Sequence, residues 1–384
     1  MTSTDDRFAP SSGGRGPSFL VLLVGLALLP LFGGTLIGID QYREVRDTRA
    51  TVDDVLEMVV EVTDLDEVRL AVVDENNFFS AVAGVQDIGI PVELVSELTG
   101  FDLIAEYERA RGHLDALLEA AAAPDVADAV EDIRQQGFDD VDGGIAAYDR
   151  VAADLELMSI DRRAELEARA ATMPSGAELV QALTLSEIAA TARSQFSDQL
   201  WTYFLAQFSP LDETSDNVIG LAAQRDRVER ALGEIERTAA PGSPLGDAVI
   251  AVSVASEVTD FRNAVDATID GVFRPEDTER DLEVDVIEQA ALSADIYRAA
   301  ASSIVYFDAV IDESLALVDE TSAIVRDAAA EQFRATISTL AITALLSLGV
   351  AIALARYVGV PMRRLTSAAA RIGDGADVDV GRHG

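Results

Sequence analysis

Two stretches of the chain lack charged residues, and both are long enough to cross a membrane. Residues 16–39 form an uncharged run of 24, and residues 335–355 form a second run of 21. A helix of about 20 apolar residues spans a hydrocarbon core of about 30 Å. The pattern therefore predicts transmembrane helices at 18–39 and 335–358. A cleaved signal peptide is the alternative for the first run, but that run exceeds the usual apolar region of about 7–15 residues.

Between these runs, residues 40–334 show helical periodicity almost throughout. Apolar residues recur at spacings of three and four, and prolines and glycines fall where helices would break. The predicted helices cover 40–84, 91–122, 124–136, 138–172, 176–208, 211–238, 245–270 and 276–334. Two stacked four-helix bundles, 40–173 and 174–334, are the economical arrangement. The predicted fold class is all-α, with two transmembrane helices flanking a pair of four-helix bundles.

The last of these helices carries the clearest apolar stripe. Ile304, Ile311, Val318 and Val325 share one heptad position, and no helix breaker separates them from the second uncharged run. Such a stripe is typical of a bundle seam. In the first uncharged run, Gly34 and Gly38 form a GxxxG pattern, which is compatible with close helix packing in a dimer.

Charge is concentrated between the two uncharged runs. All 29 basic residues are arginine, and residues 40–334 hold 22 of them against 63 acidic residues, a net charge of −41. Arginines follow the second run directly, at Arg356, Arg363, Arg364 and Arg371. The positive-inside rule then places 1–17 and 359–384 in the cytoplasm and the central domain outside the cell membrane. So acidic a surface argues against a nucleic-acid partner, since phosphate neutralisation needs basic side chains.

Several kinds of chemistry are excluded by composition. The chain has no cysteine and only two histidines, His113 and His383. It therefore has no disulfide framework, thiolate nucleophile or Cys-type zinc site, and no HExxH helix. No Gly-rich phosphate loop, GxSxG elbow or ordered acid–base pair is present. We expect no catalytic site, no metal and no cofactor, so the chain is predicted not to be an enzyme.

The segment after the second run has a specific pattern. Pro361 stands where the chain would leave the bilayer, Leu365 and Ile372 lie seven residues apart, and Gly375 follows as a helix end. This segment resembles the first half of a HAMP linker, the parallel coiled-coil relay found beneath receptor membrane helices. The resemblance implies that 359–384 is a partial HAMP linker in a homodimer, with a downstream signalling module absent from this chain. An amphipathic membrane-proximal helix without a signalling role is the alternative.

The outer segment resembles a second signalling family. The Phe-Ser-Pro turn at 208–210 with the helix after it, and the long helix around 282–318, are similar to parts of the NIT (nitrate- and nitrite-sensing) domain. The resemblance implies two four-helix bundles with a site between them for a small anion, bound by arginines in Glu-Arg pairs. Here the first such place has Glu75-Asn76, and the second has no Glu-Arg pair.

Three polar residues on apolar stripes are candidate ligand-binding residues. Arg69 and Asn76 lie on the stripe of the first outer helix, and Arg193 shares a stripe with Leu183 and Leu200. A buried arginine must be paired or bind an anion, because an isolated charge in a low dielectric is very costly. The alternative is that both arginines pair with acidic residues and that Asn76 sets helix register. Trp201 and Tyr203 either line a pocket or are core aromatics.

These predictions combine into one functional hypothesis. The chain is predicted to be a membrane-anchored receptor whose outer domain detects a small ligand, with nitrate, nitrite or another small anion as the candidate. The signal would pass through the HAMP relay to an output module. The alternative is a helical surface stalk or protein-interaction module with no small-molecule ligand.

Overall fold

The computed structural model describes the backbone of residues 19–87, 91–99, 102–121, 123–208, 211–273, 286–354, 356–357 and 360–373. These residues are helical almost throughout and include no strand. The helices are α1 (Phe19–Asp87), α2 (Val92–Thr99), α3 (Leu103–Ala120), α4 (Pro124–Gln136), the 3-10 helix η1 (Gly137–Asp139), α5 (Val141–Ala170), α6 (Gly176–Phe208), α7 (Leu211–Thr238), α8 (Pro244–Val254), α9 (Ser256–Phe273), α10 (Val286–Leu354) and α11 (Val360–Gly373). The predicted all-α class is confirmed for this part of the chain.

Local chemistry sets several helix starts. The side chain of Asp102 accepts a hydrogen bond from the backbone N–H of Ala105, and Asp140 does the same for Gly143, so each carboxylate caps the helix that follows. Ser243 caps α8 in the same way, and proline occupies the first position of that helix, where a missing N–H costs nothing. These caps satisfy N–H groups that would otherwise lack a partner.

Two predicted helices are each divided in the structure. The predicted helix 91–122 is wrong as one element, because α2 ends at Thr99 and α3 begins at Leu103. The predicted helix 245–270 is also wrong as one element, because α8 ends at Val254 and α9 begins at Ser256. Ala255 adopts an extended conformation between α8 and α9, yet its N–H still bonds Ala251 and its carbonyl accepts from Thr259. This single extended residue redirects the chain while the apolar residues on either side of it stay in one core.

The turn between α5 and α6 depends on a glycine. A Cβ atom at Gly176 would lie 2.0 Å from the carbonyl oxygen of Ala170, a distance that no side chain tolerates. The preceding Ser175 has φ of 57°, in the left-handed region. The turn brings α6 back against α5, near the division predicted at Pro174.

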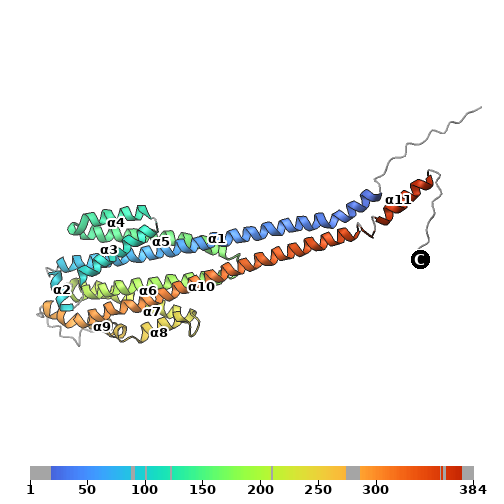
Figure 1. The fold of residues 1–384 in the computed structure, drawn as a ribbon. Coiled ribbons are helices and arrows are strands. Elements are labelled where there is room, and N and C mark those ends of the chain that lie inside the picture. The colour runs from blue at the N-terminus through green and yellow to red at the C-terminus, as the bar shows by residue number, and fades with distance from the viewer. Residues whose placement is uncertain are drawn as a thin grey trace, which may run out of the picture. The chain divides into compact units, whose positions relative to one another are not determined.

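Residues 51–328 form one compact unit with two hydrophobic cores. The C-terminal core is formed by α6 to α10, where Phe196 stacks on Phe307 with ring centroids 4.3 Å apart and meets Phe261 edge-on at 5.4 Å. Figure 1 shows α3, α4 and α5 beside α1, and α7, α8 and α9 beside α6 and α10. The N-terminal core is formed by α1 to α5 around Val72, Phe79, Leu114, Tyr148 and Leu155.

The heptad stripe of α10 packs within its own chain. Val318 and Val325 are only 3% and 1% exposed, and Ile304 and Ile311 are half-buried against the C-terminal core. The stripe is therefore a seam inside one subunit, and its burial needs no second copy.

The second compact unit consists of the residues before 51 and after 328. Here α1 and α10 run antiparallel, and a Cβ atom added to Gly38 would lie 3.0 Å from Cδ2 of Leu340. The guanidinium of Arg49 lies over the ring of Phe333, 5.6 Å from its centroid. Gly38 therefore faces Leu340 of the same chain. The GxxxG pattern was compatible with a different arrangement, in which the glycines pack against a second copy.

One helix in the described part of the chain, Asp295–Ala353 within α10, is long and apolar enough to cross a membrane, and its apolar window is not covered by the rest of the structure. A continuous exposed apolar band of this kind is typical of a lipid-facing surface. Its large exposed side chains are Ile342, Leu345, Leu346, Leu348, Val350 and Ile352. The side chains of 19–37 lie outside the described residues, so the first predicted span remains a prediction.

Candidate functional site

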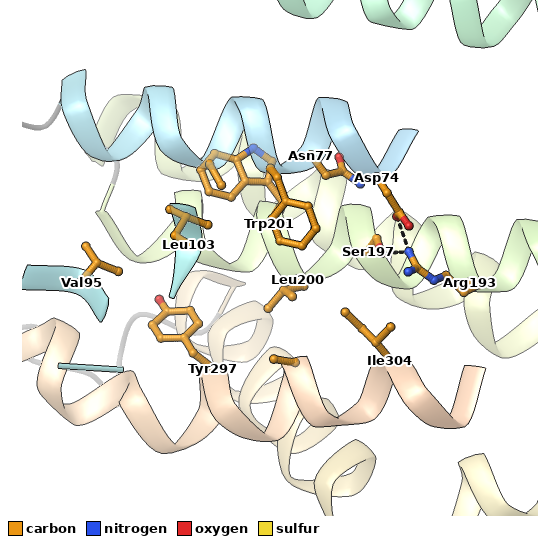
Figure 2. A pocket seen from close by; sticks show the side chains of 13 residues that line it. Asp74, Asn77, Val95, Leu103, Arg193, Ser197, Leu200, Trp201, Tyr297 and Ile304 are labelled. Atoms are coloured by element: carbon orange, nitrogen blue, oxygen red, sulfur yellow. Dashed lines mark hydrogen bonds and ion pairs between the residues drawn. The ribbon is translucent and has the colours of Figure 1, made fainter. Parts of the chain in front are cut away.

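A cavity of about 100 Å³ lies where helices of the two cores meet, and Figure 2 shows the side chains around it. Three helices supply most of its wall: α1, α6 and α10. Val95 of α2 and Leu103 at the start of α3 close one side. The wall is mainly apolar and aromatic, which is typical of small-molecule sites.

Helical spacing explains how these residues converge. Each of the three main helices contributes a set of lining residues in steps of three and four, which place the set on one face of the helix. On α1 this face is distinct from the face that carries Val72, Phe79 and Val82 into the N-terminal core. The lining residues are Asp74, Asn77, Phe78 and Ala81 on α1, Arg193, Ser197, Leu200 and Trp201 on α6, and Tyr297, Ala301 and Ile304 on α10.

Arg193 organises the polar end of the cavity. Its Nη1 donates hydrogen bonds to Oδ1 of Asp74 and to Oγ of Ser197, the latter at 2.6 Å, and its Nε donates to Oδ1 of Asp308 at 3.1 Å. These bonds join α6 to α1 and α10. Arg193 is only 8% exposed, so its two carboxylate partners are what make its burial tolerable.

Burial shapes the acidity of this group. It raises the pKa of Asp74, an effect to which nearby Asp308 adds and which Arg193 opposes. Burial alone would lower the pKa of Arg193, but the carboxylates of Asp74 and Asp308 raise it above its ordinary value. Arg193 therefore stays charged, and two carboxyl groups share this one guanidinium.

Two further carboxylates lie close to the cavity. Asn77 donates from Nδ2 to Oδ1 of Asp198 at 3.2 Å, and Asn76 donates in the same way to Asp149 at 2.9 Å. Burial raises the pKa of Asp198, and the charges of Asp74 and Asp149 add to this effect. With Asp74 and Asp308, Asp198 brings the acidic groups at or beside the polar end to three, against one arginine.

Of the three predicted ligand-binding residues, the structure places one at the cavity and two elsewhere. Arg193 lines the cavity, and its pairing with acidic residues is the alternative that the sequence left open. Arg69 is half-buried and does not line the cavity. Asn76 is buried, but its amide bonds a carboxylate of α5, while the next two residues of α1 face the cavity. Trp201 lines the cavity, whereas Tyr203 packs in the C-terminal core.

Sequence reasoning missed Asp74, Asp308, Phe78 and Tyr297. The signal for the α1 residues was present, because the four lining residues of that helix form a second stripe beside the apolar one. Nothing in the sequence pairs Arg193 with Asp74 and Asp308, which lie 119 and 115 residues away in the chain. That pairing follows from the packing of α6 against α1 and α10.

A larger hollow of about 590 Å³ borders the cavity. Arg109 and His113 of α3 and Asp308 of α10 line this hollow. The two spaces meet at the residues that line both of them. The shared residues are Asp74, Phe78, Arg193, Ala301 and Ile304.

A separate buried network involves Glu75 and does not reach the cavity. Arg134 donates from Nε to Oε1 of Glu75 at 2.7 Å and from Nη2 to Oε2 at 2.6 Å. The hydroxyl of Tyr148 donates to Oε1 at 2.6 Å, and Arg134 also bonds Asp115 at 2.6 Å. Glu75 is fully buried, so its place beside Asn76 reflects packing of α1 with α4 and α5.

The residues of the predicted relay are described in part. Pro361 lies in the first turn of α11, and Leu365 on the same helix is 64% exposed. The side chain of Ile372 and the whole of Gly375 lie outside the described residues. The short helix that the relay pattern predicts is therefore present, and α11 runs to Gly373.

Comparisons of the chain with protein-family models, with curated proteins and with solved structures gave no match.

Proposed function

We propose that this protein is a two-pass membrane receptor whose outer helical domain binds a small ligand in the cavity between α1, α6 and α10. Movement of α1 and α10 then passes to α11, the first helix of a HAMP-type relay, and to an output module. We further propose that the receptor is a homodimer with residues 40–334 outside the cell and both ends of the chain in the cytoplasm.

The observation that carries this proposal is the continuity of α10. The helix that bears Tyr297, Ala301 and Ile304 at the cavity continues unbroken to Leu354, through the candidate membrane span. Helix α1 also lines the cavity and extends back to Phe19 without a break. A ligand that binds one arrangement of these helices better than another shifts the equilibrium between them. The helices that contact the ligand are therefore also those that would carry the signal.

Topology is tested with single cysteines, because the natural chain has none. Val60→Cys, Val254→Cys and Leu365→Cys each replace an exposed side chain. A membrane-impermeant maleimide added to intact cells should label the first two, and the third only after permeabilisation. Labelling of Leu365→Cys in intact cells, or protection of Val60→Cys and Val254→Cys, contradicts the two-pass receptor.

A second experiment separates a receptor from a stalk. Gly38→Cys combined with Leu340→Cys should form a disulfide within one chain under copper-phenanthroline oxidation, since Gly38 faces Leu340. Gly38→Cys with Ile342→Cys is the matched control, because Ile342 is exposed. Adding Ala301→Phe, which fills the cavity, should change the rate of the 38–340 disulfide. Ala323→Phe, at an exposed position of α10, should not. An unchanged rate with Ala301→Phe favours the stalk.

A further inference from the structure

The cavity has an apolar aromatic body and a polar end where two carboxyl groups bond one guanidinium. Figure 2 shows Asp74, Arg193 and Ser197 gathered at one side, with Trp201 between them and Tyr297 at the other side. Aromatic faces carry negative potential and attract cations, tryptophan most strongly. The aromatic wall therefore suits either an apolar group or a desolvated cation.

Charges at the polar end decide between a cation and an anion. Among the described residues, Arg193 is the one arginine that lines the cavity, and it already bonds two carboxylates, Asp74 and Asp308. Asp198, which accepts a hydrogen bond from Asn77, adds a third carboxylate nearby. An anion at Arg193 would be attracted by one guanidinium and repelled by two carboxyl groups, whereas a cation at Asp74 would be attracted by two carboxyl groups and repelled by one guanidinium. The net charge of −41 on the central domain also draws cations from solution.

Size and donor arrangement limit the kind of cation. An apolar cavity of about 150 Å³ accepts benzene, which has six heavy atoms, so a cavity of about 100 Å³ suits a molecule of about four or five. Among the described residues, no group of three or more His, Asp and Glu side chains converges to hold a metal ion. Asp74, Asn77 and Ser197 supply oxygens at the polar end alone, fewer than the about six to eight oxygen ligands that an inorganic cation such as Ca²⁺ takes.

We propose that the cavity binds a small organic cation of the alkylammonium class, with its charge toward Asp74 and its alkyl groups against Trp201, Phe78 and Tyr297. This inference rests on the receptor function proposed above and names the class of its ligand. It departs from the anion that the NIT resemblance implies, because the arginine expected to bind that anion is neutralised by the protein itself.

The chain supplies its own reporter of cavity occupancy. Trp201 is the only tryptophan in the sequence, and it lines the cavity. Full-length protein in lipid nanodiscs is titrated at constant ionic strength with tetramethylammonium chloride, while Trp201 fluorescence is recorded. The matched probe is tert-butanol, a neutral molecule of nearly the same size and shape, and sodium nitrate is the anionic probe. Tetramethylammonium should give a saturable change, and the other two should not.

One substitution tests the charge directly. Asp74→Asn keeps the shape of the side chain and removes its charge, so it should weaken tetramethylammonium binding at least about tenfold. Asp128→Asn makes the same change at an exposed position of α4 and should leave binding unaltered. Circular dichroism on both variants checks that the helices are retained. Binding to wild type already separates the cation from its neutral analogue, so the test does not depend on a variant that folds.

Three results overturn the alkylammonium class. These are no saturable response to tetramethylammonium, equal responses to tetramethylammonium and tert-butanol, and a saturable response to nitrate alone. None of these results bears on the labelling of Val60→Cys or on the 38–340 disulfide. Failure of the ligand class is therefore distinguishable from failure of the receptor function.

Discussion

At the scale of single residues, this acidic protein buries two arginines in different ways. Arg193 bonds two carboxyl groups at the edge of a cavity, and one of them, that of Asp308, is half exposed. Arg134 instead makes a bidentate pair with fully buried Glu75, supported by the hydroxyl of Tyr148. The first arrangement has one more carboxyl group than guanidinium. The second is complete in itself and is expected to act on stability alone.

The Glu75 network gives the first prediction at this scale. Glu75→Gln leaves Arg134 buried without its main counter-charge, and breaking a buried pair costs about 3–5 kcal/mol. Because Asp115 still bonds Arg134, we expect a loss near the lower end, about 3 kcal/mol, which lowers the unfolding temperature by roughly 6–10 °C. Asp226→Asn, which removes the exposed pair with Arg230, should change stability by less than about 1 kcal/mol. Thermal circular dichroism measures both, and equal losses would contradict the argument.

Asp198 gives a pH-dependent prediction. Burial first, and then the charges of Asp74 and Asp149, raise its pKa in the folded protein, while Asn77 and Arg227 oppose the rise. The folded state therefore binds this proton more tightly than the unfolded chain does. Stability contributed by this group is gained as pH falls through the raised pKa and lost as pH rises through it, with a slope of at most about 1.4 kcal/mol per pH unit.

Asp198→Asn should remove this slope. The variant should be more stable than wild type at pH 7, and the gap should close as pH falls toward the ordinary range of aspartate. The oxygen of the introduced amide can still accept the hydrogen bond from Asn77, so the packing is kept. Asp154→Asn, at an exposed position of α5, removes the same charge from the surface. If both variants shift the unfolding temperature equally from about pH 5 to 8, general charge repulsion is responsible and Asp198 has no special role.

At the scale of helices, several helix bounds were predictable because the breaks beside them have a local cause. Proline or glycine begins α4, α6 and α8, and the predicted bounds of α4, α6 and α7 match the structure. The break at Ala255 was not predictable, since no proline or glycine stands there and the residue is extended only because both flanking helices pack on one core. Arg193 and Trp201, which line the cavity, lie on a helical face that is visible in the sequence. The contact of Arg193 with Asp308 was hidden, because it depends on how α10 lies against α6.

Packing between α1 and α10 gives a prediction for these elements. Gly38→Leu would force a side chain into the space of Leu340 and push the helices apart, whereas Gly38→Ala needs a shift of only a few tenths of an ångström. The pair Arg49→Cys and Phe333→Cys, placed where the two side chains now touch, reports the separation by oxidative crosslinking. Gly38→Leu should reduce this crosslink several-fold and Gly38→Ala should not. Equal crosslinking in both variants would show that the close approach at Gly38 is not needed.

At the scale of the whole molecule, the two cores of residues 51–328 are joined by polar contacts from α6 and α5. Arg163 of α5 bonds Asp66 of α1 and, at 3.0 Å, Glu187 of α6, and Arg193 bonds a carboxylate of α1. Charged contacts of this kind reorganise more readily than an interdigitated apolar core, which is close-packed. A ligand beside Arg193 therefore acts where the two cores are joined by exchangeable hydrogen bonds.

The last prediction concerns the proposed homodimer. The heptad stripe of α10 is covered by its own chain, so α10 does not need a partner along Val318 and Val325. Leu365 of α11 is the opposite case, because a leucine 64% exposed on an amphipathic helix gains by packing against a second copy. We therefore expect the two chains to meet along α11.

Single cysteines distinguish these positions in native membranes. Leu365→Cys should form a disulfide-linked dimer on mild oxidation, and Val318→Cys should not, since its side chain is buried within one chain. Leu365→Asp, which places a charge in the proposed contact between two copies of α11, should abolish dimers captured through a cysteine at another exposed position. It should leave tetramethylammonium binding unchanged. A crosslink at position 318 with none at 365 would mean that α10 opens to pair with its copy, and the single-chain packing of the stripe would then be wrong for the dimer.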